Sequence, residues 1–267
     1  MITERSDPDR GDPDRGDPGP KVAAHHRGGT GLARIPYPIG VRTAPVSAIT
    51  DLGPRMRRIT LCGPGLAGFP THHFDDHVKI IFPGPDGVRR DPVPNRRQML
   101  DWPRPLPPSR SYTVRRHDPV RHEIDLDFVL HDGGLASTWV RGVTVGEPVT
   151  IAGPPGAKTF PLTYARYLFA VDGTALPAVA RWLDESPVEV RAHVVIADEV
   201  PGYPLTDREH VTVVHDELAS ITAQTGTFLF AAGEAGALKP LRAWSRGRLD
   251  HMITGYWKHG VADHDDH

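Results

Sequence analysis

The hydrophobic pattern changes near residue 160, and this change constrains the fold more than any other feature of the chain. Before it, short segments alternate apolar and polar residues between glycine- and proline-rich turns, which indicates an antiparallel barrel or sandwich. After it, apolar runs such as RYLFAV (166–171) and TFLFAAG (227–233) are followed by helical patterns. Strands that alternate with helices indicate a parallel sheet covered on both faces. We therefore expect two domains, an antiparallel β-barrel at 33–160 and an α/β domain with a parallel sheet at 161–267.

Individual strands can be assigned within each half. In the first half, MRRITL, HVKIIFP and EPVTIAGP are strand candidates, and RSYTVRR, the turn HDPVRH and EIDLDFVL form a hairpin. In EIDLDFVL, the apolar Ile124, Leu126, Phe128 and Leu130 alternate with Asp125, Asp127 and Val129. A period of two predicts a strand with one buried face. In the second half, VEVRAHVVIA, HVTVVH and HMITGYW are further strands, and ALPAVARWLDES and EAGALKPLRAW are helices.

The first 32 residues differ from the rest of the chain. They contain an imperfect repeat, DPDRGDPDRGDPGP, rich in Asp, Pro, Arg and Gly. Such a segment has almost nothing to bury, so we expect residues 1–32 to form a disordered tail. A functional charged tail is the alternative.

Charge and cysteine content exclude several classes of protein. The formal net charge of −2 does not favour a general nucleic-acid binder. The single cysteine, Cys62, excludes an intrachain disulfide, a cysteine-ligated iron–sulfur cluster and a cysteine zinc site. No apolar run approaches membrane-spanning length, and the N-terminus has no signal-peptide core. We expect a soluble cytoplasmic protein.

Two loops occupy the position at which open α/β sheets bind ligands, beyond the carboxyl ends of strands. VDGTALP (171–177) follows the first strand of the second half, and AAGEAG (231–236) follows a later one. Their glycines would let a ligand approach the backbone, and a helix starting near Ala175 would offer free amides to an anion. Each glycine is equally explained by a simple turn.

A second anion site is suggested by HDGGLASTWV (131–140). Gly133 and Gly134 follow a strand there, and Ser137 and Thr138 lie where a helical turn can begin. Free amides and hydroxyls suit a pyrophosphate. The alternative is an ordinary connection with a serine near the helix start.

The segment SRSYTVRR (109–116) alternates polar residues where an ordinary strand alternates apolar with polar ones. Arg110 can pair with a phosphate through its planar guanidinium. Tyr112 points to the same face and can lie against a ring, with Thr113 at the ring's edge. The alternative is a solvated edge strand protected by its charges.

Taken in order, these segments resemble one known family, the siderophore-interacting proteins or ferric-siderophore reductases, a branch of the ferredoxin-reductase-like flavoproteins. The resemblance covers most of the chain after residue 32 and ends in a GYW motif. It is carried by DDHVKIIFP, RSYTVRR, IDLDFVLH, GLASTWV, GEPVTIAGPPG, LFAVDGTALPAVARWL, AAGEAGALKPLR and GYWKHG. It implies an FAD-binding barrel followed by an NAD(P)H-binding α/β domain.

The resemblance also implies roles for individual residues. The flavin clamp of the family matches Arg110, Ser111, Tyr112 and Thr113; the pyrophosphate segment matches Gly134, Ala136 and Ser137, with Val129 and His131 near the ribityl-adenine side. The nicotinamide loop matches Gly173, Thr174, Ala175 and Pro177, while Gly233 and Glu234 would face the nicotinamide or the adenine end. Tyr256 and Trp257 match the terminal motif that closes over the flavin or nucleotide, and Lys258 would attract the siderophore.

The chain departs from the family pattern at three places. It has Asp172-Gly173-Thr174 where the family commonly reads Asp-Glu-Thr, and Lys258-His259 where arginine is usual. The connection before HMITGYW is also short. These departures concern nucleotide use. Because Asp198 and Glu199 follow the second strand and would repel a 2′-phosphate, they favour NADH over NADPH; ferredoxin is a further candidate donor.

The remaining candidates have plainer explanations. Histidine pairs occur at 25–26 and 72–73, and HDDH ends the chain; His and Asp together can bind metal. The first and last clusters lie in predicted tails and the second in a loop, so we expect surface histidines and no metal site. The basic run VRRDPVPNRR (88–97) can steer an anionic substrate or be a simple exposed loop. No Ser-His-Asp arrangement or paired carboxylates support a hydrolase.

The sequence therefore predicts an FAD-dependent ferric-siderophore reductase, in which electrons pass from NADH or NADPH through the flavin to chelated Fe(III). Reduction releases iron because Fe(II) binds hard oxygen ligands more weakly. The flavin supplies the redox chemistry, so no side chain is expected to act as acid or base. Two alternatives stay open: a flavin or electron-transfer reductase with another acceptor, and a non-catalytic siderophore-binding protein.

Overall fold

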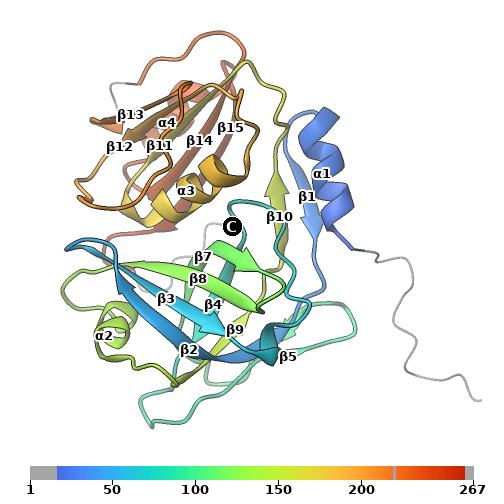
Figure 1. The fold of residues 1–267 in the computed structure, drawn as a ribbon, viewed down its shortest axis with the longest axis vertical. Coiled ribbons are helices and arrows are strands. Elements are labelled where there is room, and N and C mark those ends of the chain that lie inside the picture. Colours follow the sequence, from blue (N-terminus) through green and yellow to red (C-terminus); the bar gives the residue numbers. More distant parts are fainter. Residues whose placement is uncertain (1–16, 219–220, 262–267) are drawn as a thin grey trace, which may run out of the picture.

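The computed structural model describes residues 17–218 and 221–261 of the 267-residue chain. It contains a closed barrel and a parallel sheet, joined between β10 and β11 (Figure 1). In the order in which they pair, the barrel strands are β2 (Val41–Asp51), β3 (Met56–Cys62), β8 (Glu123–Val129), β7 (Ser109–Asp118), β4 (His77–Ile81) and β9 (Pro148–Ala152). All of these pairs are antiparallel. The predicted barrel is confirmed.

Smaller elements surround the barrel. They are η1 (Pro64–Leu66), the two-stranded β5 (Val93–Pro94) and β6 (Leu100–Asp101), and α2 (Leu135–Gly142) between β8 and β9. Apolar side chains from alternate positions of the barrel strands fill its interior, among them Ile59, Val78 and Leu126. Each of these three is at most 1% exposed, as expected for inward-facing residues of a small barrel.

The parallel sheet has five strands in the order β13-β12-β11-β14-β15. Its elements along the chain are β11 (Arg166–Val171), η2 (Gly173–Ala175), α3 (Leu176–Glu185), β12 (Ala192–Ile196), β13 (Val211–His215), β14 (Thr227–Glu234), α4 (Lys239–Ser245) and β15 (Asp250–Trp257). Helix α3 packs on the face that carries Phe169 and Phe230, and α4 packs on the face that carries Leu168 and Leu229. The predicted parallel sheet with both faces covered is confirmed. No described helix is long and apolar enough to cross a membrane.

The predicted tail at 1–32 is wrong for its last part. Residues Gly19–Gly28 form helix α1, followed by β1 (Ala33–Pro36), which pairs with β10 (Gly156–Thr159). Val22 is 1% exposed and packs on Tyr37 and Ala157. The helix is therefore packed against the β1–β10 strand pair through Val22. Residues 1–16 lie outside the described part.

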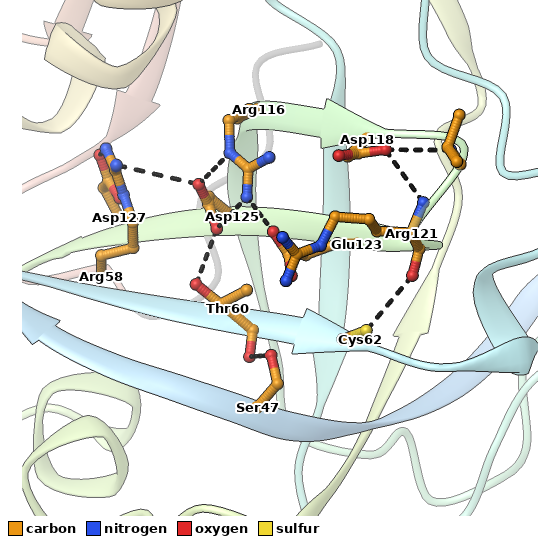
Figure 2. A network of polar contacts seen from close by, with 11 residues as sticks. Ser47, Arg58, Thr60, Cys62, Arg116, Asp118, Arg121, Glu123, Asp125 and Asp127 are labelled. Carbon is orange, nitrogen blue, oxygen red and sulfur yellow. Dashed lines mark hydrogen bonds and ion pairs between the residues drawn. The ribbon is translucent and has the colours of Figure 1, made fainter.

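The hairpin of β7 and β8 is confirmed, but the prediction of one buried face on β8 is wrong. Asp125 and Asp127 are only 3% and 4% exposed. Figure 2 shows why: arginines from the two neighbouring strands approach these carboxylates from either side. Arg58 on β3 donates to both oxygens of Asp127 at 2.7 and 2.8 Å, and Arg116 on β7 donates to Asp125 at 2.6 Å. Pairing of the charges within the sheet offsets the cost of removing this polar face from water.

The same carboxylate face joins the barrel to the second half. Tyr203, from the connection between β12 and β13, donates from its hydroxyl to Asp127 Oδ2 at 2.7 Å. On α3, the 3%-exposed Arg181 donates to Thr71 Oγ1 at 2.7 Å and to the carbonyl oxygen of Val114 at 3.0 Å. The strength of such buried charge-assisted hydrogen bonds depends on the placement of donor and acceptor. The bonds of Tyr203 and Arg181 therefore hold the parallel sheet in one position against the barrel.

Candidate functional site

Some of the predicted site residues meet where the end of β8 and the loop before β4 face the carboxyl edge of the parallel sheet: Val129, Gly173, Glu234, Tyr256 and Trp257. Val171 pairs with Ala232 in neighbouring strands, so the loops after β11 and β14 lie side by side. A Cβ placed on Gly173 would lie 3.7 Å from Val129 at the end of β8. The site is therefore lined by both halves of the chain, between the barrel and the sheet of Figure 1.

The predicted shared face of Arg110 and Tyr112 is confirmed by strand register. Arg110 lies opposite Ile80, and Tyr112 lies opposite Val78 on β4. The Tyr112 ring is half-buried and rests on Phe128 with ring centroids 4.1 Å apart. Burial raises the pKa of the Tyr112 phenol above its usual value, so this ring stays neutral.

The Arg110 guanidinium is available for an anion. Its Nη1 donates to the carbonyl oxygen of Ser109 at 2.6 Å. Within residues 17–218 and 221–261, no carboxylate forms an ion pair with it. On the opposite face of β7, Ser111 is half-buried and Thr113 is 6% exposed. Arg110 thus differs from Arg115 and Arg116, which pair with carboxylates.

The glycine turn before α2 has the geometry of an open helix start. Gly133 and Gly134 have φ angles of 72° and 81°, a region that side chains disfavour. No side chain caps the first amides of α2, and this helix presents the positive end of its dipole at the same point. The exposed His131 and the buried Ala136 flank the turn.

The Ser137 hydroxyl is committed within the protein. It donates to the carbonyl oxygen of His131 at 2.7 Å and accepts from the His131 amide at 3.0 Å. The side chain is 2% exposed. The Ser137 hydroxyl therefore stabilises the glycine turn. The expectation of a free hydroxyl here is wrong, because the hydroxyl is already hydrogen-bonded to the backbone of His131.

The loop after β11 is organised by carboxylates, contrary to the expected set of free amides. The Thr174 amide donates to Asp172 Oδ1 at 2.9 Å, the Gly173 amide to Asp198 Oδ2 at 3.3 Å, and the Ala175 amide to the carbonyl oxygen of Asp172 at 3.1 Å. Pro177 has no amide hydrogen to offer. The amides of residues 173–175 are therefore occupied by Asp172 and Asp198, whereas no side chain caps the start of α3 itself.

The loop after β14 is fastened to the same carboxylate. The Glu234 amide donates to Asp172 Oδ2 at 2.9 Å. The Glu234 carboxylate accepts from the amides of Ala237 at 2.6 Å and His259 at 3.2 Å; these bonds lower its pKa, the Ala237 bond most. Glu234 therefore links its own loop to the segment that follows β15.

The terminal motif reaches both halves of the chain. Tyr256 donates from its hydroxyl to Asp75, in the loop before β4. Trp257 Nε1 donates to Asp172 Oδ2 at 2.8 Å, and the indole is 41% exposed. Lys258 is exposed directly after it. The sequence pointed to these aromatics but missed Asp75 and Asp172 as their partners; for Asp172, its place directly after a buried parallel strand was the available signal.

The histidine pairs are not the surface groups that the sequence suggested. Helix α1 brings His26 to His73, with Nε2 and Nδ1 3.2 Å apart, and His73 is 2% exposed. Within the described part of the chain, no three His, Cys, Asp or Glu residues are arranged to hold a metal ion. The terminal HDDH lies outside the described residues. The basic run is an exposed loop in which Arg89 pairs with Asp91 and Arg90 with Asp86.

The His26–His73 contact predicts acid sensitivity. Burial, aided by His25, lowers the pKa of His26 to about 4, whereas an unfolded histidine titrates near 6.5. The stabilisation from keeping His26 neutral is therefore complete above pH 6.5 and is lost as the pH falls toward 4. Asp76, whose pKa burial raises to about 6, acts in the opposite sense.

The variant His26→Gln separates the contribution of His26 to the pH dependence of stability from that of Asp76. In His26→Gln, the loss of urea stability between pH 7 and pH 4.5 should be smaller than in the wild type, because one group that resists protonation is gone. Urea midpoints at four pH values measure this. Parallel pH curves for the two proteins would contradict the assignment.

The residues of the barrel side fit a flat, phosphate-bearing group. An arginine without a carboxylate partner among the described residues and an uncapped helix start suit phosphate groups, and a half-buried tyrosine ring on the face of that arginine suits a flat ring, as FAD has both. A barrel and a parallel sheet with the site between them define a class, the ferredoxin-reductase-like FAD- and nucleotide-binding proteins.

Comparison with known proteins agrees with this class. Residues 45–158 match the family model described as "Siderophore-interacting FAD-binding domain", and residues 164–260 match "Siderophore-interacting protein". A siderophore utilization protein from T. fusca has 32% identity and a TM-score of 0.78, over 88% of this chain and 99% of that one. The ferredoxin reductase of carbazole 1,9a-dioxygenase shares the fold, with 14% identity and a TM-score of 0.58, over 84% of this chain and 71% of that one.

A curated relative from Escherichia coli K12, named NADPH-dependent ferric-chelate reductase, is 38% identical over 152 residues. This match covers 57% of this chain and 59% of that reductase. The chain belongs to the siderophore-interacting protein family.

Proposed function

We propose that this protein is an FAD-dependent oxidoreductase that reduces ferric siderophores with electrons from NADH or NADPH. The balanced reaction converts NAD(P)H and two Fe(III) into NAD(P)⁺, a proton and two Fe(II). Bound FAD would supply the exchange between a two-electron donor and one-electron acceptors. The weaker hold of oxygen ligands on Fe(II) would then release the iron.

The protein's part is to hold and orient. Residues 33–160 would bind FAD, with Arg110 at a phosphate and Tyr112 at the ring. The others on this side are Ser111, Thr113, Val129, His131, Gly134, Ala136 and Ser137, of which Ser137 would act by shaping the turn. Residues 161–267 would hold the nicotinamide along Gly173, Thr174, Ala175, Pro177, Gly233 and Glu234. The boundaries of the two family models, 45–158 and 164–260, support this division.

The acceptor side rests on the terminal segment. Lys258 is exposed directly after Trp257, so an anionic siderophore complex would meet a cation there, whereas Tyr256 and Trp257 would close over the flavin or the nucleotide. Ferredoxin is an alternative electron donor. With a single cysteine, Cys62, and no disulfide to protect, the protein suits the cytoplasm.

One observation carries the proposal: Arg110 and Tyr112 share a face of β7 in a chain of this family, with no carboxylate of the described residues paired to that arginine. The test is anaerobic oxidation of the photoreduced, FAD-loaded protein by ferric siderophores of the catecholate, hydroxamate and carboxylate classes. Rapid oxidation by at least one class is expected. Rapid oxidation only by free flavin or another protein would reject the substrate, and a protein that does not bind FAD would reject the function.

Asp198 predicts the choice of nicotinamide. Its half-buried carboxylate lies just beyond β12 beside Gly173, where it would repel a 2′-phosphate. We expect kcat/KM to be about tenfold or more higher for NADH than for NADPH, because about 1.4 kcal/mol of discrimination corresponds to tenfold. Asp198→Asn should narrow this ratio.

Steady-state kinetics with both nucleotides measure the effect. Glu199→Gln removes the second carboxylate of this pair and should narrow the ratio less than Asp198→Asn does. Glu199 is exposed, and its carbonyl oxygen accepts from Arg55. A wild-type preference for NADPH, as the name of the Escherichia coli relative implies for that protein, would show that Asp198 does not face the ribose.

A further inference from the structure

Two consecutive aromatic residues at the end of β15, Tyr256 and Trp257, form hydrogen bonds with different halves of the chain. The pairing of β14 with β15 shifts register between Gly233 and Glu234, so that Gly233 lies opposite Gly255 while Glu234 lies opposite Trp257. Tyr256 is the extra residue of this bulge. A bulge redirects the side chains around it, which here lets Tyr256 reach the barrel and Trp257 reach the loop after β11.

The Asp172 carboxylate accepts a hydrogen bond from Trp257, and an amide in its place could not accept all the hydrogen bonds that Asp172 accepts. Its Oδ1 accepts from the Thr174 amide at 2.9 Å and from Thr174 Oγ1 at 2.5 Å; its Oδ2 accepts from the Glu234 amide at 2.9 Å and from Trp257 Nε1 at 2.8 Å. The residue is 7% exposed. Four donors use all the acceptor capacity of a carboxylate, so an NH₂ group at either position would face two other donors.

Gly233 keeps this arrangement compact. A Cβ at this position would lie 2.5 Å from Asp172 Oδ2 and 2.6 Å from its Cγ, and the φ angle is 149°. Only glycine lets β14 approach the carboxylate so closely. Glu234 adds a second fastening, because its Oε1 accepts from the amide of His259 beyond Trp257 at 3.2 Å.

Asp75 receives the Tyr256 hydroxyl on the barrel side. Asp75 is half-buried and lies beside Asp76, whose carboxylate is held separately by Tyr37, Thr71 and the amides of His72 and His73. The side-chain hydrogen bonds within this loop are therefore made by Asp76, and the Asp75 carboxylate bonds to Tyr256 instead. Asp75 thus contacts the terminal segment from the barrel half of the chain, whereas Asp172 contacts it from the second half.

We propose that Asp75 and Asp172 are positioning residues that hold Tyr256 and Trp257 in place from the two halves of the chain before any ligand binds. Trp257 stays 41% exposed although its Nε1 is bonded, so the indole is both fixed and accessible. A fixed ring does not have to be immobilised when a ligand arrives, so the entropy cost of ordering that side chain is not added to the cost of binding. That the ligand is the flavin–nicotinamide pair rests on the proposed function.

The contacts are tested in the ligand-free protein by ¹⁹F NMR. The protein is labelled with 5-fluorotryptophan or 3-fluorotyrosine, and Trp257→Phe and Tyr256→Phe assign the resonances. Asp172→Asn should shift or broaden the Trp257 resonance, and Asp75→Asn should do so for Tyr256. The other four of the five tryptophans and five of the six tyrosines report whether each variant is folded.

Asp250→Asn is the matched control. Asp250 accepts from the Tyr164 hydroxyl at 2.7 Å at the start of β15, the opposite end of the same strand. This variant should move the Tyr164 resonance and leave Tyr256 and Trp257 unchanged. If Asp172→Asn and Asp75→Asn leave the Trp257 and Tyr256 resonances within their line widths, the positioning role is overturned. If Asp172→Asn does not fold, Trp257→Phe, which lacks the Nε1 donor but keeps a ring, takes its place in the binding measurement below.

The consequence for binding is measured separately, by titrating FAD into the apoprotein and following flavin fluorescence. We expect Asp172→Asn, Asp75→Asn and Trp257→Phe to weaken FAD binding about three- to tenfold, and Asp250→Asn to change it less than twofold. Shifted ¹⁹F resonances with unchanged FAD affinity would keep the fixed aromatic pair but overturn its role toward the flavin. No FAD binding by the wild type would reject the proposed function and leave the NMR result standing.

Discussion

Arg110→Ala is expected to weaken FAD binding by roughly 30- to 100-fold. A hydrogen bond to a charged group contributes about 1.5–3 kcal/mol, and about 2–3 kcal/mol corresponds to this range of affinity. The guanidinium donates to the Ser109 carbonyl oxygen and has no carboxylate partner among the described residues. Its loss would therefore remove the proposed phosphate contact without breaking an ion pair between described residues.

Flavin content after gel filtration and fluorescence titration of the apoprotein measure this effect. Arg110→Lys keeps the charge but loses the planar pair of donors, so an intermediate loss is expected. Arg97→Ala removes an exposed arginine between β5 and β6 and should leave FAD affinity unchanged. Equal losses in Arg97→Ala and Arg110→Ala would mean that only overall charge matters, and undiminished flavin content in Arg110→Ala would contradict the phosphate contact.

Asp127→Asn is expected to destabilise the fold by about 3 kcal/mol. Removing one partner of a buried ion pair costs about 3–5 kcal/mol because the other charge is left uncompensated. We expect the lower end of this range, because Arg58 in the variant still has the Asp125 carboxylate 3.8 Å away. The variant also weakens the Tyr203 bond that joins the second half of the chain to the barrel, so the two halves should unfold less cooperatively.

Asp51→Asn is the matched control for this prediction. Asp51 also pairs with an arginine at 2.7 Å, but its side chain is 64% exposed, whereas that of Asp127 is 0% exposed. Exposed pairs contribute about 0–1 kcal/mol, so Asp51→Asn should change the urea midpoint little. Similar destabilisation by both variants would show that the burial of Asp127 is not what matters.

Much of the fold could be predicted because its hydrophobic periods are clear. The alternation in EIDLDFVL and the apolar run RYLFAV indicate a barrel strand and a parallel strand, and both strands formed. The wrong predictions, such as the exposed polar face of β8 and the disordered tail, concern contacts with distant segments. Helix α1 is ordered by Val22 against a strand pair formed by residues 33–36 and 156–159, a contact that no local pattern encodes.

The site shows the same division. Arg110 and Tyr112 could be assigned to one face because strand geometry fixes side-chain direction locally. The hydrogen bonds of Asp172 could not be assigned, since its donors come from positions as distant as Glu234 and Trp257. Hydrogen bonding between remote segments depends on ångström-scale placement of whole strands.

The sequence by itself determined the two-part architecture, the charged and aromatic face of β7, and the edge at which the loops after β11 and β14 meet, because these follow from short-range periodicity and strand direction. Tertiary structure alone decided that Asp127 is buried and paired, that the amides before α3 are occupied, and that Asp75 and Asp172 hold Tyr256 and Trp257. The physical reason is that a carboxylate's role depends on which donors and how much water surround it, and packing of distant segments sets both.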